Sequence, residues 1–246
     1  MLTSLADSLL SIVYPQPCVV CGNCVENRRY GVACETCWTQ TRIFTGSETL
    51  CSKCGAYLRE KPSAYEIHCH NCEGHFYDSA HAVGVYEKAL AATILELKRN
   101  PSIPKALRGH IKSALDRIEF SEAALIIPVP LSAKRRLERG FNQAETVASF
   151  IASETGLHVE KGVLERTIHT AIHRVAMDRK AREMSVAKAF KLSQPEKIIG
   201  KDLLLVDDVL TSGATVSACA RILKKGGARA AQIFTLGRAV LRQQSL

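Results

Sequence analysis

Two adjacent aspartates and the hydroxyl-rich turn after them form the most informative chemical pattern in the sequence. Asp207 and Asp208 directly follow Leu203–Val206, an apolar segment that we predict to be a buried strand. A helix is predicted to begin near Ala214 and to end at Gly226-Gly227. The small residues that lead into this helix are Thr211, Ser212, Gly213, Ala214 and Thr215.

This order of strand, acidic pair, turn and helix suits a sugar phosphate. The N-terminus of a helix presents unpaired N–H groups and a partial positive charge, which favour a phosphate dianion. Gly213 lets the backbone approach the ligand closely, and the neighbouring hydroxyl groups add donors. Asp207 and Asp208 are acceptors for vicinal sugar hydroxyls and could also lie near a bound Mg²⁺. We therefore expect the turn to hold a ribose 5-phosphate.

A basic segment follows a second predicted strand, Ala124–Val129. Guanidinium groups bind phosphate oxygens through paired hydrogen bonds, so this segment is a second candidate for phosphate contact. Two alternatives remain open, namely a solvated basic helix face and a contact to a nucleic acid backbone. The basic residues are Lys134, Arg135, Arg136 and Arg139.

Nine of the ten cysteines lie between Cys18 and Cys72, and their spacing predicts metal binding. Tetrahedral zinc takes four soft ligands, which two C-x2-C pairs supply. Sequential pairing predicts one or two structural zinc ions. The four pairs are Cys18/Cys21, Cys34/Cys37, Cys51/Cys54 and Cys69/Cys72.

Cys24 leaves an alternative, because Cys21/Cys24 has the same spacing as Cys18/Cys21. Gly22 favours Cys18/Cys21, since a glycine after the second cysteine permits the positive φ of a tight turn, as Gly55 does after Cys54. Histidines could replace a cysteine ligand, although the cysteine sets are complete. These histidines are His68, His70 and His75.

Composition places the chain among globular proteins, and its basic charge indicates either acidic partners or a solvated basic surface. It has 246 residues, 46% of them hydrophobic, and a formal net charge of +9. Such a charge favours nucleic acid, phosphorylated metabolites or an anionic membrane surface. We find no secretory signal and no apolar run long enough for a membrane span, so we expect a cytoplasmic protein in which clustered cysteines bind metal.

The change in composition after the cysteines divides the chain into two expected domains, residues 1–78 and residues 79–246. The first would contain an amphipathic helix over Leu2–Val13 and the cysteine-rich module. In the second, strands alternate with helices, which predicts an α/β fold with a mostly parallel sheet. The further predicted elements are a strand at Ala230–Leu236 and helices at Thr93–Leu97, Ile103–Ile118 and Ala144–Ser153.

The segment VDDVLTSGAT resembles the phosphoribosyl pyrophosphate (PRPP) motif of type I phosphoribosyltransferases. Nearly the whole chain resembles the ComF family, in which a cysteine-rich zinc ribbon precedes such a domain. Pro128–Gln143 is similar to a family segment after a strand, Arg166–Phe190 to its flexible loop, and Tyr86 and Lys98 fall where the family has a Tyr and a helix ending in Lys. Ser185 and His173 depart from the pattern of the loop.

The resemblance implies a role in natural transformation, handling single-stranded DNA beside a helicase-like partner. It also implies that PRPP binds with Mg²⁺ and that the basic segment meets its pyrophosphate. Two other functions are compatible with the residues, a PRPP-dependent transferase of nucleotide salvage and a PRPP or nucleotide sensor without turnover. Glycosyl transfer would pass through an oxocarbenium-like transition state, with Arg166–Phe190 closing over the site.

Overall fold

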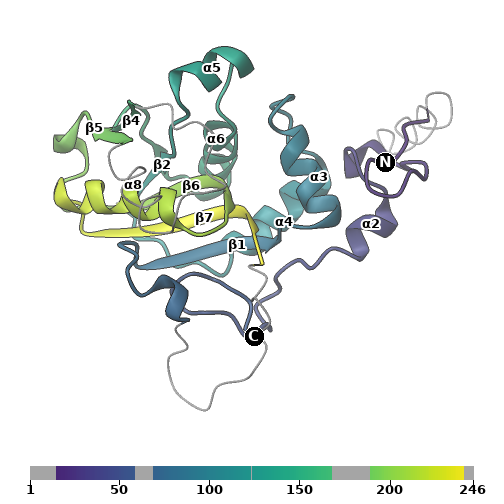
Figure 1. Cartoon of the computed structure of the whole chain (residues 1–246), viewed down its shortest axis with the longest axis horizontal. Coiled ribbons are helices and arrows are strands. Elements are labelled where there is room, and N and C mark those ends of the chain that lie inside the picture. Colours follow the sequence, from purple (N-terminus) through teal and green to yellow (C-terminus); the bar gives the residue numbers. More distant parts are fainter. Residues whose placement is uncertain (1–14, 59–68, 123, 168–188, 241–246) are drawn as a thin grey trace, which may run out of the picture.

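A five-stranded parallel sheet forms the centre of the structure, a computed structural model that describes residues 15–58, 69–122, 124–167 and 189–240 (Figure 1). Each neighbouring pair in this sheet is parallel. The predicted helix Leu2–Val13, and His173 and Ser185, lie outside the described residues. In their order across the sheet, the strands are β1 (Ser79–Val85), β7 (Ala230–Arg238), β6 (Asp202–Leu210), β2 (Leu125–Pro128) and β3 (His158–Val159).

Helices cover both faces of the sheet, because alternate residues of a buried strand point to opposite sides. Leu204 and Val206 belong to one buried cluster and Leu203 and Leu205 to the other. The first cluster includes side chains from α3 (Lys88–Glu96), α4 (Lys105–Leu115) and α6 (Gln143–Thr155). The second includes the apolar face of α8 (Ala214–Lys225).

The connections of the sheet diverge between β2 and β6. The chain leaves β2 through α5 (Ala133–Arg139) and α6 toward β3, whereas it leaves β6 through α8 toward β7 on the other side. In open parallel sheets, ligands bind outside the carboxyl ends of the strands where the connections diverge in this way. The fold therefore favours a ligand site at the carboxyl ends of β2 and β6.

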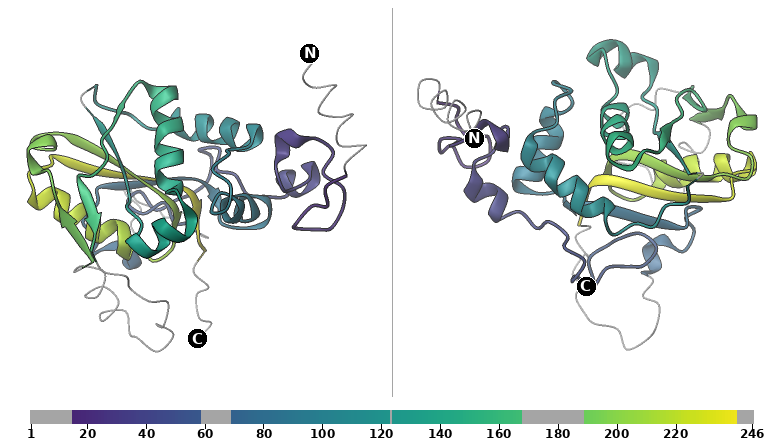
Figure 2. Two further views of the ribbon diagram at one scale, coloured as in Figure 1. Left: turned by 90° about the horizontal axis from the view of Figure 1, so that it is seen from above. Right: turned by 180° about the vertical axis from the view of Figure 1, so that it is seen from behind.

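The cysteine-rich segments pack on different parts of the molecule (Figures 1 and 2). The first contains η1 (Arg28–Tyr30) and α2 (Glu35–Thr39) and joins the cluster of α3 and α4, where the rings of Trp38 and His110 lie 5.3 Å apart. The second contains η2 (His70–Cys72) and joins the cluster of α8.

The expected α/β fold with a parallel sheet and a cysteine-rich module is confirmed. Helix α8 begins at Ala214 and is followed by Gly226, as predicted, while α3, α4, α6 and β7 overlap the other predicted segments. Strand β1 was not among the predicted elements. Neither was the antiparallel pair β4 (Leu164–Arg166) and β5 (Phe190–Leu192), in which the ends of the expected flexible loop meet. The other residues of that loop, 168–188, lie outside the described part.

Candidate functional site

Asp207 and Asp208 lie within β6, rather than after its end as the sequence predicted. The strand continues to Leu210 because β7 continues beside it, with Asp207 opposite Thr235. On its other side, pairing with β2 stops at Val206. The two aspartates therefore project beyond β2 at the carboxyl edge of the sheet, where the connections diverge.

The two carboxylates have different surroundings. Burial raises the pKa of Asp207 to about 8, with a further rise from the Asp208 carboxylate, although a backbone hydrogen bond and the cations Lys98 and Arg166 oppose this rise. The Asp208 carboxylate instead lies 3.1 Å from the ammonium of Lys98, just beyond the end of α3. The pair thus combines one carboxyl that favours its proton at neutral pH with one that is neutralised by a cation.

The turn after β6 leads directly into the N-terminus of α8. Gly213 caps the helix with φ of 80° and offers no capping side chain, and the first helical hydrogen bond runs from Ser217 N to Gly213 O. Thr211 and Ser212 are exposed, and Thr215 is half-buried. Helix N–H groups and hydroxyl donors thus lie together at the end of β6, as a phosphate dianion requires.

The basic segment after β2 is a helix and not a loop. Ser132 caps α5 by accepting a hydrogen bond from Arg135 N, and Gly140 ends it with φ of 77°. The helical conformation spreads the cations around α5. Arg136 pairs with Glu145 at 2.7 Å, whereas the ammonium of Lys134 lies 4.0 Å from Glu138. Arg135 and Arg139 are half-buried.

The eight expected cysteine ligands form two separate groups. Within each group the sulfur atoms lie within 4.8 Å of one another, in the sequential pairing that the sequence predicted. Zinc–sulfur bonds of about 2.3 Å in a tetrahedron place sulfur atoms about 3.8 Å apart. The measured separations are 3.8 Å for Cys18–Cys37 and 3.6 Å for Cys51–Cys72, so both donor sets fit a zinc ion.

One cysteine in each group has a lowered pKa, which favours its thiolate form. Burial raises the pKa of Cys18, but N–H groups of the surrounding backbone, among them those of Cys34 and Val20, outweigh it and hold the pKa at about 6. Cys51 is held at a pKa of about 6 in the same way. A thiolate is the form of cysteine that binds metal, so the backbone around Cys18 and Cys51 favours metal binding.

The alternative ligands lie outside both groups. Cys24 is exposed, and its backbone forms an isolated antiparallel β-bridge with Pro17. His70 approaches Glu73, and His75 is hydrogen-bonded to Tyr77. Gly22 and Gly55 have φ of 81° and 62°, as expected for the turns that follow the second cysteine of a pair. His68 lies outside the described residues.

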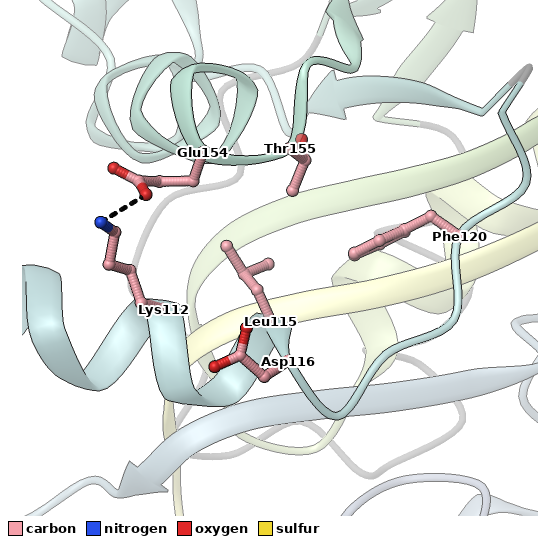
Figure 3. A pocket seen from close by; sticks show the side chains of 6 residues that line it. All are labelled: Lys112, Leu115, Asp116, Phe120, Glu154 and Thr155. Carbon is pink, nitrogen blue, oxygen red and sulfur yellow. Dashed lines mark ion pairs between the residues drawn. The ribbon is translucent and has the colours of Figure 1, made fainter.

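A cavity of about 480 Å³ lies at the opposite edge of the sheet (Figure 3). It is lined by the C-terminal ends of α4 and α6, which lead into the amino ends of β2 and β3, and by Phe120. Lys112 and Glu154, both in its lining, form an ion pair with their atoms 2.8 Å apart. This cavity is remote from the aspartates, and we assign no role to it.

Comparison with protein families decides what the two parts are. Residues 9–73 match the double zinc ribbon domain, and residues 133–241 match the phosphoribosyl transferase domain. The chain thus combines a segment similar to a double zinc ribbon with a segment similar to a phosphoribosyltransferase domain. Both cysteine groups lie in the double zinc ribbon, and the turn before α8 lies in the phosphoribosyltransferase domain.

Three relatives match most of the chain. "Competence protein F" of Haemophilus influenzae is 26% identical over 90% of this chain and 96% of its own. "DNA utilization protein YhgH" of Escherichia coli is 27% identical, with 92% and 99% covered. "Competence protein ComFC" of Bacillus subtilis is 25% identical, with 82% of each covered. The resemblance to the ComF family is confirmed.

Matches among solved structures include glutamine PRPP amidotransferase from Bacillus subtilis, complexed with ADP and GMP. It is 19% identical with a TM-score of 0.39, and the match covers 58% of this chain and 30% of that chain. A second match, described as an allosteric regulatory enzyme of purine biosynthesis, has a TM-score of 0.37, 21% identity and the same coverage.

Within the described residues, no helix is sufficiently long and apolar to span a membrane.

Lys98 and Arg238 lie at the site but are not among the site residues expected from the sequence. Lys98 was noted only through the family resemblance, and its pairing with Asp208 depends on how α3 packs against β7. Arg238 ends β7 and is 5% exposed, with its guanidinium against the backbone at the end of β6. A charged residue at the end of the apolar run of β7 was the one available signal for Arg238.

Proposed function

We propose that the carboxyl edge of β6 binds the ribose 5-phosphate of PRPP. The observation that carries this proposal is the placement of Asp207 and Asp208 at the end of β6, one short turn before the N-terminus of α8, whose N-cap residue Gly213 has no side chain. In this arrangement the turn from Thr211 to Thr215 holds the phosphate, and the aspartates hold the ribose hydroxyls. The match to a phosphoribosyl transferase domain over residues 133–241 supports this assignment.

Mg²⁺ enters this proposal bound to the pyrophosphate of PRPP. Lys98 neutralises Asp208, and Asp207 favours its protonated form, so the pair is better suited to sugar hydroxyls than to a cation. Helix α5 supplies candidate cations for the pyrophosphate, and we keep Lys134, Arg135, Arg136 and Arg139 as that proposed set. The domain boundary remains proposed at residues 78 and 79, where β1 begins.

Calorimetry with PRPP and Mg²⁺ tests the site directly. The double variant Asp207→Ala/Asp208→Ala should lose measurable binding, because both acceptors for the ribose are removed. Asp116→Ala, at the cavity on the opposite edge, is the matched control and should bind as the unchanged protein does. Unchanged affinity in the double variant would remove the ribose role. Pyrophosphate release with a panel of bases then separates a transferase from a sensor that binds without turnover.

We further propose that the protein acts on single-stranded DNA in the cytoplasm during natural competence, beside a helicase-like partner. The names of its relatives and the net charge of +9 support this role. Fluorescence anisotropy with a labelled oligonucleotide should show binding that weakens steeply with salt, because counterions are released from phosphates. Absence of binding at low salt would contradict this part of the proposal.

A further inference from the structure

Arg238 connects the second cysteine cluster (Cys51, Cys54, Cys69 and Cys72) to the turn that precedes α8. Its Nε donates to Cys54 O at 3.1 Å, and its Nη2 lies 3.6 Å from Cys54 Sγ. Its Nη1 donates to Leu210 O at 2.9 Å and to Thr211 O at 2.5 Å. One buried guanidinium therefore contacts a cysteine of the second cluster, the carbonyl of the last residue of β6 and the first carbonyl of the turn.

A second contact joins the same cluster to the same turn. The chain that follows Cys72 lies against the first turn of α8, where Phe76 N donates to Ser217 Oγ at 3.2 Å. His75 and Tyr77, joined by a hydrogen bond of 2.7 Å, cover Gly213. A Cβ atom at Gly213 would lie 2.6 Å from His75 Cε1 and 3.1 Å from the Tyr77 hydroxyl. The cysteine segment thus packs directly on the N-cap of α8.

The first cysteine cluster (Cys18, Cys21, Cys34 and Cys37) makes its contacts elsewhere. Cys18, Cys34 and Cys37 belong to the buried cluster of α3 and α4, on the other face of the sheet, and Cys21 is exposed. Near it, Ala89 N at the start of α3 donates to Thr41 Oγ1. The two clusters have the same ligand chemistry and different neighbours, so each can serve as the control for the other.

Arg238 orients the peptide groups of the turn. In a trans peptide, the carbonyl of one residue and the N–H of the next point in opposite directions. Because the carbonyl of Thr211 faces Arg238, the N–H of Ser212 points away from the guanidinium. Arg238 cannot lose its proton, and its fork supplies donors to Cys54 and to both carbonyls at once. A metal ion that fixes Cys54 therefore also fixes this orientation.

We propose that the second cysteine cluster positions the phosphate turn and that Arg238 is the positioning residue through which it acts. The inference rests on the proposed function, since it assumes that the turn is the phosphate site. It makes the second zinc ion more than a support for the ribbon. Metal binding there and ribose 5-phosphate binding become coupled, and the coupling must be equal in both directions.

The first test measures ribose 5-phosphate binding to the zinc-loaded full chain by calorimetry. Arg238→Lys keeps the charge but loses the fork, and we expect about tenfold weaker binding. Arg229→Lys is the matched control, because Arg229 pairs with Asp202 at the opposite end of β6 and β7. Its affinity should stay within about twofold of the unchanged protein. Unchanged affinity in an Arg238→Lys protein that retains both metal ions would overturn the inference.

The second test follows the coupling from the metal side. In cobalt-loaded protein, ribose 5-phosphate should shift the thiolate-to-cobalt absorption, because it changes the hydrogen bond between Arg238 and Cys54. The shift should persist in Cys18→Ser/Cys21→Ser, in which the first cluster is broken, and disappear in Arg238→Lys. A saturated cobalt protein without any shift would contradict the coupling.

Failure of the proposed function would be recognised separately. If the unchanged protein binds no ribose 5-phosphate, the phosphate assignment fails, and amide hydrogen exchange decides whether the cluster positions the turn. Exchange over residues 211–215 should then be faster in Arg238→Lys than in the unchanged protein, while α4 exchanges equally in both. Equal exchange in the turn would overturn the positioning role as well.

Discussion

The ammonium of Lys98 lies 3.1 Å from the carboxylate of Asp208, so a residue beyond the end of α3 completes the acidic pair of β6. Without this cation, two adjacent carboxyl groups would face a ligand that itself carries negative charge. Lys98 offsets that repulsion, while burial favours the proton of Asp207. The ammonium of Lys98 and the proton on Asp207 together reduce the negative charge of the site, while the carboxyl oxygens remain as acceptors.

Replacing Lys98 should therefore weaken the binding of ribose 5-phosphate. We expect Lys98→Met to lower the affinity by about tenfold, because the unpaired Asp208 carboxylate would repel the phosphate dianion. Lys112→Met is the matched control, since Lys112 forms a similar pair with Glu154 at the opposite edge of the sheet, with atoms 2.8 Å apart. Titration calorimetry of both variants checks this, and equal losses would contradict the role of Lys98.

Asp207 should make the stability of the protein depend on pH. Its folded pKa of about 8 lies above its ordinary value of 3.8, so between these values the folded protein keeps a proton that the unfolded chain has released. The contribution of Asp207 to stability therefore falls as pH rises through this interval. Asp207→Asn should be more stable than the unchanged protein by an amount that grows until about pH 8 and then stays constant.

Thermal unfolding at several pH values measures this difference. Asp202→Asn is the control with the opposite sign, because the Arg229 guanidinium lowers the pKa of Asp202. That carboxylate contributes stability above its ordinary pKa, and the contribution is lost as pH falls. An Asp207→Asn variant whose Tm difference does not change with pH would contradict the raised pKa.

A side chain at Gly213 should destabilise the protein, for two separable reasons. Its φ of 80° is strained for other residues, and a Cβ would meet His75 at 2.6 Å. Gly140 has nearly the same φ, 77°, but no atom lies within 4 Å of its Cβ position. Gly140→Ala should cost about 1 kcal/mol of unfolding free energy, from the backbone alone. Gly213→Ala should cost at least about 1 kcal/mol more, and urea unfolding of both variants gives the comparison.

The metal content should be two zinc ions per chain, one for each cysteine group. Cys54→Ser and Cys21→Ser should each reduce the measured content by one ion, because a tetrahedral site loses one of its four thiolates. Cys24→Ser should retain both ions, since Cys24 is exposed and outside the groups. Elemental analysis of protein purified without a metal-affinity tag provides the measurement, and a loss of zinc in Cys24→Ser would contradict the assigned pairing.

Local patterns predicted much of this molecule because their chemistry depends on residues close in sequence. The spacing of the cysteines and the position of Gly22 identified both ligand groups, and the glycines around α8 marked its ends. Strand β1 escaped prediction because its sequence, SAHAVGV, has neither a clean alternation nor a long apolar run. The length of β6 escaped it because two aspartates disfavour a strand, while pairing with β7 supplies the hydrogen bonds that hold them in one.

The basic segment is a further case in which the sequence did not predict the local conformation. Guanidinium groups suggested phosphate contact, but the capping residues Ser132 and Gly140 form a helix there. Arg136 then turns toward Glu145 of α6. Sequence composition identified the cations, whereas the conformation of α5 decides which ligand each one can reach.

The sequence by itself indicated the two cysteine groups, the order of strand, turn and helix around Asp207 and Gly213, and the resemblance to the ComF family. Those features depend on residues close together in the sequence, and such residues stay close together in the folded chain. Only the tertiary structure brought Lys98 to Asp208 and placed Arg238 between Cys54 and the carbonyl of Thr211. Each of these contacts joins residues more than 20 positions apart, and charge and hydrogen bonding select such partners only after the sheet and its helices have packed.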